Sequence, residues 1–174
     1  MISSNLSAIV VLLVNILLIN ILALVNSTFG SYGVFLSISG VFFYSALIFL
    51  NGVQAKIVLF VTGLFLDVQM QTLFGFHAFV LLFFYIVITD WYFRSKRSEF
   101  IRPGLIEIFC NSTLMMSWAL LSVLILEGID MPRFFANFCL STLLLIPLCK
   151  WNLKLISDLQ NILKITDKKN LQTN

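Results

Sequence analysis

Residues 63–78 read GLFLDVQMQTLFGFHA, an apolar stretch that polar residues interrupt once before it resumes. The interruption begins at Asp67, the only acid of this stretch, and continues through Gln69, Gln71 and Thr72. An acidic side chain at the centre of a membrane-spanning helix costs roughly 2.5 to 3.5 kcal/mol on insertion scales. Such a residue persists where it has a partner, a cavity or a shallow depth, so Asp67 is the first residue to explain.

The composition around this hairpin is that of a membrane protein. Of the 174 residues, 60% are hydrophobic and 11% are charged, whereas about a quarter of the residues in soluble domains are charged. The mean hydropathy is +1.01, and no charged side chain precedes Lys56. Since a spanning helix needs about 20 residues, we expect an all-α integral membrane protein with six transmembrane helices. The net charge of +3 is too small to indicate a nucleic-acid partner.

The first helix is expected over residues 6–25. This apolar run has no basic segment before it and is too long for the core of a signal peptide, so we interpret it as a retained helix. Its two amides, Asn15 and Asn20, are interpreted as bonding neighbouring helices. The three cysteines stand singly in apolar runs without CxxC spacing, which favours core packing over a metal site; they are Cys110, Cys139 and Cys149.

The second helix is expected over residues 33–50. Gly33, Ser37 and Gly40 would then fall at i, i+4 and i+7, forming a groove of small residues on one face. Such a groove lets another backbone approach closely. Its use as a helix–helix seam, as a partner-binding face, or as space for a ligand or lipid stays open at this point.

Four further helices complete the transmembrane domain, residues 1–149. We expect them from about Val53 to the acid Asp67 and beyond, over 72–93, over 103–126 and over 133–149 with Pro147 near its end. Glu107 falls in a first helical turn, where the helix dipole favours an anion, so we interpret it as a surface residue.

Residues 150–174 are expected to form a cytoplasmic tail. Apolar residues recur there at helical spacing, namely Trp151, Leu155, Leu159 and Ile162. This pattern predicts a C-terminal amphipathic helix on the membrane surface, with a solvated extension of the sixth helix as the alternative. The tail and the loop at 94–102 hold nine of the eleven basic residues, which predicts that both termini are cytoplasmic. Asp67 and His77 would then lie near the outer face.

The sequence offers little for catalysis. It has one histidine, His77, no HExxH motif and no pair of aspartates at one depth on adjacent helices. We therefore expect no enzyme activity, cofactor or metal. For Asp67 we expect a structural role, in which the carboxylate folds back to accept N–H bonds from Leu73 to Gly75. An Asp67–His77 pair and direct contact with a partner or ligand are the alternatives.

The hairpin resembles the signature of the MreD family of rod-shape-determining proteins. The resemblance rests on the glycine–apolar–aspartate segment from Gly63 to Asp67, the eight-residue step to Gly75, and the helix restart through His77 and Ala78. Many members have proline–leucine before the second glycine, where this chain has Leu73-Phe74. The resemblance implies that Gly63, Asp67, Gly75 and His77 form a structural or partner-binding hairpin.

The family implies a non-enzymatic subunit of the bacterial cell-elongation machinery, which synthesises peptidoglycan in rod-shaped cells. Its location would be the cytoplasmic (inner) membrane, among membrane lipids. Its partners would be an MreC-like membrane protein and, indirectly, MreB filaments, RodA and its penicillin-binding protein. The resemblance also implies the six-helix fold of substrate-binding subunits of energy-coupling-factor importers.

That fold supplies an alternative function, a small-solute-binding subunit of such an importer. It would need an outward pocket, for which the candidate lining residues are Tyr32, Asp67, Gln69, Gln71 and His77.

Overall fold

A computed structural model of the chain describes residues 2–94, 103–125 and 130–172, with side chains at 5–89, 105–124 and 130–162. Within these ranges the regular elements are helices, and no strand occurs. Their order is α1 (Ile2–Phe29), η1 (Gly30–Tyr32), α2 (Ser39–Phe49), α3 (Gly52–Met70), α4 (Phe76–Arg94), α5 (Pro103–Ile125) and α6 (Met131–Gln172). The predicted all-α class is therefore confirmed. The basic loop expected at 94–102 lies outside the described side chains.

The helix α2 lies at the centre of the packing. Its residues 39–47 are all buried, and the rings of Phe42 and Phe43 are fully enclosed. The helix carries no charged residue, as expected for one that other helices surround on all sides. It packs against α1, α3, α5 and α6, while α3 also packs against α1 and α4.

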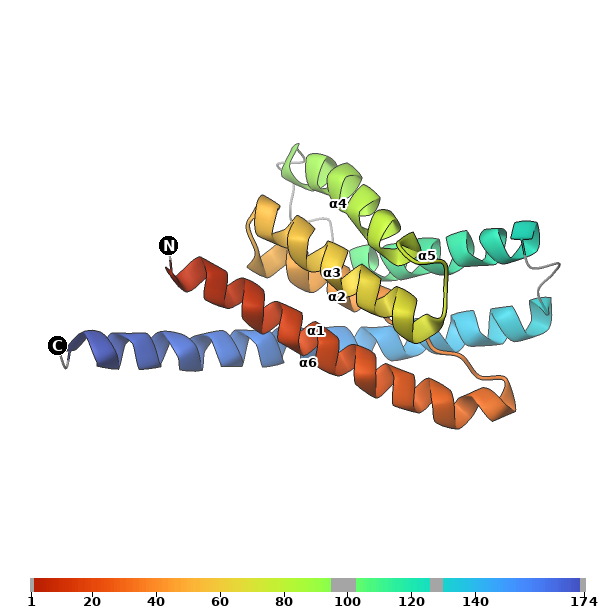
Figure 1. Cartoon of the computed structure of the whole chain (residues 1–174), viewed down its shortest axis with the longest axis horizontal. Coiled ribbons are helices and arrows are strands. Elements are labelled where there is room, and N and C mark those ends of the chain that lie inside the picture. The colour runs from red at the N-terminus through yellow and green to blue at the C-terminus, as the bar shows by residue number, and fades with distance from the viewer. Residues whose placement is uncertain (1, 95–102, 126–129, 173–174) are drawn as a thin grey trace.

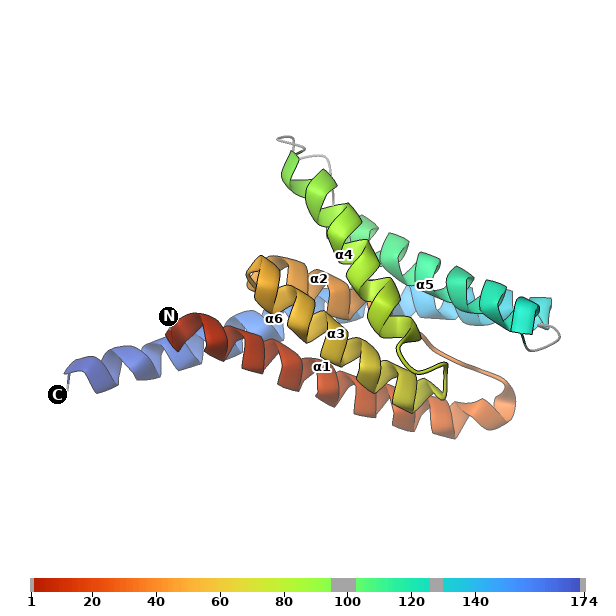
Figure 2. The ribbon, with the colours of Figure 1, turned by 45° about the horizontal axis from the view of Figure 1, so that its top comes forward.

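The chain runs back and forth so that both termini lie at one end of the bundle (Figure 1). The α3–α4 turn, the segment around η1 and the start of α6 lie at the opposite end, as the tilted view also shows (Figure 2). The hairpin that contains Asp67 is therefore far from both termini.

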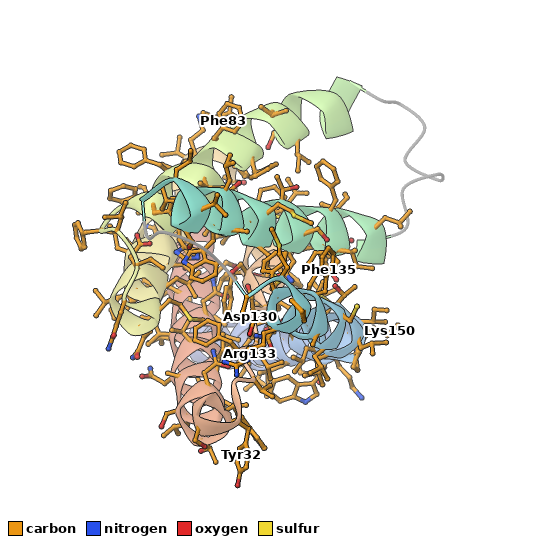
Figure 3. All side chains as sticks on the ribbon, turned by 90° about the vertical axis from the view of Figure 1, so that its right-hand side faces the viewer. Tyr32, Phe83, Asp130, Arg133, Phe135 and Lys150 are labelled. Atoms are coloured by element: carbon orange, nitrogen blue, oxygen red, sulfur yellow. The ribbon has the colours of Figure 1, made fainter. Side chains whose placement is uncertain are left out.

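Four of the described helices, α1, α3, α5 and α6, are long and apolar enough to cross a membrane, and α2 and the described part of α4 are shorter apolar helices. Large apolar side chains cover the outer surface, including Leu24, Phe79 and Leu124. Figure 3 shows Phe83 on the outside of α4, directed away from the bundle. A surface this apolar suits lipid better than water. The chain is a multi-pass membrane protein.

The prediction of a helix over 33–50 is wrong in its first third. Gly33 ends η1 with a φ of 76°, and α2 begins only at Ser39. The three small residues therefore do not share one helix face, and the predicted groove does not form.

Side chains from other helices explain why residues 34–38 stay out of a helix. The Asn26 amide of α1 brackets Leu36, accepting its N–H at 2.8 Å and donating to its carbonyl at 3.0 Å. From α6, Asn137 Oδ1 accepts the Phe35 N–H and Ser141 Oγ accepts the Ser37 N–H. Because these side chains satisfy the backbone groups, the segment needs no helical bonds of its own.

The sixth helix is longer than expected. The structure has one continuous helix, α6, that passes through Pro147 and includes residues 150–172 of the predicted tail. Buried side chains on both sides of the proline, Leu145, Cys149 and Ile156, keep one face of α6 against the core. Leu155 and Leu159, expected to face lipid, are partly buried against that core.

Candidate functional site

Asp67 lies in the last turn of α3, where the helix ends in a left-handed residue. Gln71 has a φ of 51°, and its N–H donates to the Asp67 main-chain carbonyl. The Thr72 N–H donates to the same carbonyl at 3.1 Å. This arrangement closes α3 and turns the chain, so α4 begins at Phe76 and not near Thr72 as expected.

The Asp67 side chain folds back across this turn and is only 1% exposed. The Gly75 N–H donates to Oδ2 at 2.8 Å, and the His77 N–H donates to Oδ1 at 2.9 Å. The Thr72 hydroxyl also donates to Oδ1, at 2.9 Å. Of the donors expected between Leu73 and Gly75, Gly75 bonds the carboxylate, and the second amide comes from His77 because α4 begins later. Such charge-assisted bonds are among the stronger ones in proteins.

The imidazole of His77 joins the same network. Its Nδ1 lies 2.8 Å from Asp67 Oδ1, and a carboxylate oxygen can only accept, so Nδ1 carries the proton. Main-chain capping and the Asp67–His77 pair, considered above as alternatives, thus occur together. The ring is held in one orientation, with Nε2 directed away from the carboxylate.

Two glycines make this hairpin compact. A Cβ on Gly63 would collide with the main chain of Ala78 and His77, so α3 and α4 cross at backbone contact there. Gly75 has a φ of 92°, which residues with a side chain rarely adopt. The four hairpin residues therefore form one interlocked unit.

The three small residues of the predicted groove occupy separate places. Gly33 faces the side chain of Arg133, and Gly40 lies against the main-chain carbonyl of Glu107. The Ser37 hydroxyl donates to Asn111 Oδ1 at 3.2 Å. Ser37 and Gly40 therefore serve contacts of the α2 region with α5 inside the molecule.

A cavity of about 370 Å³ opens beside the hairpin. Its walls come from the segment before α2, the α3–α4 turn, α5 and the start of α6. The apolar wall includes Phe35, Leu114, Met115, Trp118 and Phe134, and the polar groups include Thr72, His77, Ser122 and Asn137.

The ion pair of Asp130 and Arg133 also lines this cavity. Figure 3 looks onto this end of the molecule and shows the pair near its centre. Of the five residues expected to line an outward pocket, only His77 does so. Tyr32 is 81% exposed and lies at the edge of this face (Figure 3).

The interpretation of Glu107 as a surface residue is wrong. Its side chain is 1% exposed, and the Cys149 thiol of α6 hydrogen-bonds to its carboxyl group. A signal for this burial was present in the sequence. Glu107 shares a helical stripe with Cys110, Asn111 and Leu114, all of which are buried.

Within the described residues, no group of three or more histidine, cysteine, aspartate or glutamate side chains is placed to hold a metal ion. No family model, curated protein or solved structure matches this chain. The features that bear on function are therefore the hairpin, the cavity and the membrane-spanning architecture.

Proposed function

We propose that this chain is a non-enzymatic membrane subunit of the bacterial cell-elongation machinery, acting as a scaffold with an MreC-like protein. The observation that carries the proposal is the closed hairpin. The four hairpin residues through which the chain resembles the MreD signature each help to form the turn. Gly63 and Gly75 do so because they lack a side chain, and Asp67 and His77 do so by hydrogen bonding across the turn. A chance resemblance to the family signature is less expected for residues with such specific structural roles than for apolar residues alone.

The hairpin is also suited to presenting a surface. Both carboxylate oxygens of Asp67 accept hydrogen bonds from the turn that follows it. This favours a structural role over acid–base chemistry. Beyond it, the turn exposes Leu73 and Phe74, the latter 77% exposed. In our proposal these two side chains contact the membrane-proximal part of the MreC-like partner, and through that partner the chain joins MreB, RodA and its penicillin-binding protein.

We also propose that the chain spans the membrane six times, with α2 and α4 as the two short spans. Its fold would be that of the substrate-binding subunits of energy-coupling-factor importers. Both termini would be cytoplasmic in the inner membrane and the hairpin would lie at the outer face. A reporter that is active only in the periplasm, fused after Asn174, should stay silent. Activity of that reporter would reverse the orientation and overturn this part of the proposal.

Deletion and re-expression in the native bacterium test the function. Loss of the chain should round the cells, and re-expression should restore rods and allow recovery of an MreC-like protein from the membrane. Two exposed phenylalanines offer a matched pair, Phe74 at the turn and Phe83 on α4. Phe74→Ala should lower recovery of the partner, whereas Phe83→Ala should not. Normal cell shape after deletion would contradict the proposal.

A second candidate function, the small-solute-binding subunit of an importer, is favoured by one observation, the cavity beside His77. Native mass spectrometry of the chain purified from its own membranes tests it. A bound small molecule, together with co-purifying ATPase subunits, would favour the importer. Recovery of an MreC-like protein without them would favour the scaffold.

A further inference from the structure

The residues that line the cavity beside the hairpin are of the kinds that bind aromatic or other flat rings. The Trp118 ring, the Phe134 ring and the flexible Met115 side chain line it together. Aromatic faces and polarisable sulfur favour flat, apolar groups. A volume of about 370 Å³ lies within the range of about 300 to 1,000 Å³ found for small-molecule sites.

One hydroxyl of this cavity has no protein partner. Ser122 is 3% exposed, and its Oγ is buried without a hydrogen bond while the residue lines the cavity. Buried polar groups are nearly always hydrogen-bonded in folded proteins. The cavity wall therefore includes one residue whose polar atom the protein leaves unpaired.

His77 gives the cavity a directed acceptor. Asp67 holds a proton on Nδ1, so in the neutral form of the imidazole Nε2 is the nitrogen left to accept a hydrogen bond, and the residue lines the cavity. A ligand that meets this nitrogen must bring an O–H or N–H donor.

The charges of the cavity are already neutralised by one another. Arg133 Nε lies 3.0 Å from Asp130 Oδ2, and both side chains are largely exposed. Both polar atoms of the Asn137 amide are already hydrogen-bonded. Oδ1 accepts from the Phe35 N–H, and Nδ2 donates to the Gly33 carbonyl. Neither an anion nor a cation would therefore find an uncompensated partner here.

We propose that this cavity binds an uncharged, ring-containing amphipathic molecule that carries one O–H or N–H donor. The ring lies against Trp118, Met115 and Phe134, and the donor bonds to Nε2 of His77. Asp67 is then a positioning residue, since it sets which nitrogen of the imidazole accepts. The site goes beyond the scaffold function and does not depend on it.

A pair of probes isolates the donor. 1-Naphthol has a fused ring and one O–H group, and 1-methoxynaphthalene has the same ring without a donor. Calorimetric titration of the full chain in lipid nanodiscs, with the heat of empty nanodiscs subtracted, should show saturable binding of 1-naphthol. Its affinity should exceed that of 1-methoxynaphthalene about fivefold, the effect of one hydrogen bond. Non-saturable uptake equal to that of empty nanodiscs would overturn the proposal.

Two variants locate the bound probe. In His77→Asn, the side-chain amide can replace Nδ1 as donor to Asp67 while Nε2 is lost, so the fivefold preference should disappear with the fold retained. In Ser122→Leu, the larger side chain fills the cavity, and binding of both probes should fall at least tenfold.

Ser117→Leu is the matched control for Ser122→Leu. Ser117 lies on the same helix, bonds to the Thr113 carbonyl and does not line the cavity, so its substitution should leave affinity unchanged. Unaltered binding in Ser122→Leu, or an unaltered preference in a folded His77→Asn, would contradict the proposal. Should His77→Asn fail to fold, Ser122→Leu and its control decide the location alone.

Discussion

Asp67 and Glu107 are both 1% exposed, and each lies in a helix that is long and apolar enough to span a membrane. Asp67 receives two main-chain N–H groups, a hydroxyl and an imidazole, all from the turn that follows it. For Glu107 the side-chain donor is the Cys149 thiol, which is a weak donor. On the same face of α6, Asn152 is buried with neither amide atom hydrogen-bonded.

Equal burial of these two acids does not mean that they are equally important to the fold. The Asp67 region is a local network in which every donor comes from within ten residues. The Glu107 region joins separate helices through fewer and weaker bonds. We therefore expect substitution of Asp67 to cost far more than substitution of Glu107, and the predictions below run from the largest effect to the smallest.

The largest effect is expected for Asp67→Ala. It should lower the free energy of unfolding by about 3 kcal/mol, because several buried donors lose their acceptor. Asp67→Asn should cost about half as much, since its oxygen can serve the donors at Oδ1 while its NH₂ group faces the Gly75 N–H. Reversible unfolding in mixed micelles, followed by circular dichroism, measures both.

Two outcomes for Asp67 would contradict the structural account. Equal losses for Asn and Ala would mean that charge, not the number of acceptors, is what matters. A stable Asp67→Ala protein that no longer supports rod shape would assign Asp67 to partner binding.

Gly63→Ala comes next. The added Cβ would meet the Ala78 main chain, and overpacking of this kind costs about 2 kcal/mol. Gly40→Ala tests the second region in the same way, since its Cβ would meet the Glu107 carbonyl. Gly30 has no atom within 4 Å of its added Cβ, so Gly30→Ala is the control and should leave the unfolding midpoint nearly unchanged. A tolerated Gly63→Ala would show that α3 and α4 can separate without loss.

Asn152→Leu should stabilise the protein by about 1 kcal/mol, because it replaces a buried amide without hydrogen bonds by an apolar group of similar size. Asn26→Leu is the contrasting variant, since Asn26 bonds both main-chain groups of Leu36. It should destabilise by about 2 kcal/mol. Thermal unfolding of the two variants under identical conditions gives opposite shifts if the assignment is correct, and a loss in Asn152→Leu would refute it.

The smallest change is expected for Glu107→Gln, within about 0.5 kcal/mol of the parent, because the glutamine amide has nearly the same shape and keeps an acceptor oxygen for the weak Cys149 donor. The same unfolding measurement applies. A loss above about 1 kcal/mol would show that Glu107 is as firmly integrated as Asp67 and would remove the contrast between the two regions.

The sequence was most informative where contacts are local. Asp67 stands out as a charge in an apolar run, and its donors follow within ten residues, so the fold-back at the turn could be predicted. The identity of the N–H donors could not be predicted, because the start of α4 depends on the left-handed conformation of Gln71. The hydrogen bond from the Thr72 hydroxyl to Asp67 could be recognised only from the three-dimensional structure.

The wrong predictions concern residues whose conformation or burial depends on contacts with distant parts of the chain. The segment before α2 stays out of a helix because Asn137 and Ser141 bond to it from more than 100 residues away, and the spacing of neighbouring residues gives no sign of these bonds. Glu107 was misassigned because its position early in a helix suited the surface equally well. The cavity combines side chains from four parts of the chain, so of its wall only Gly33, Ser37 and His77, for which space for a ligand had been considered, could be anticipated.

The continuous α6 has a geometric consequence for the whole molecule. With 42 residues at about 1.5 Å each, it is about 63 Å long, roughly twice the thickness of the apolar layer of a bilayer. Tilt alone cannot accommodate such a rod, so its far part must stand out of the membrane as a stalk. Since its first turn borders the cavity and its last turns project beyond the N-terminal end of α1 (Figure 1), α6 connects the cavity end of the bundle with the end at which both termini lie.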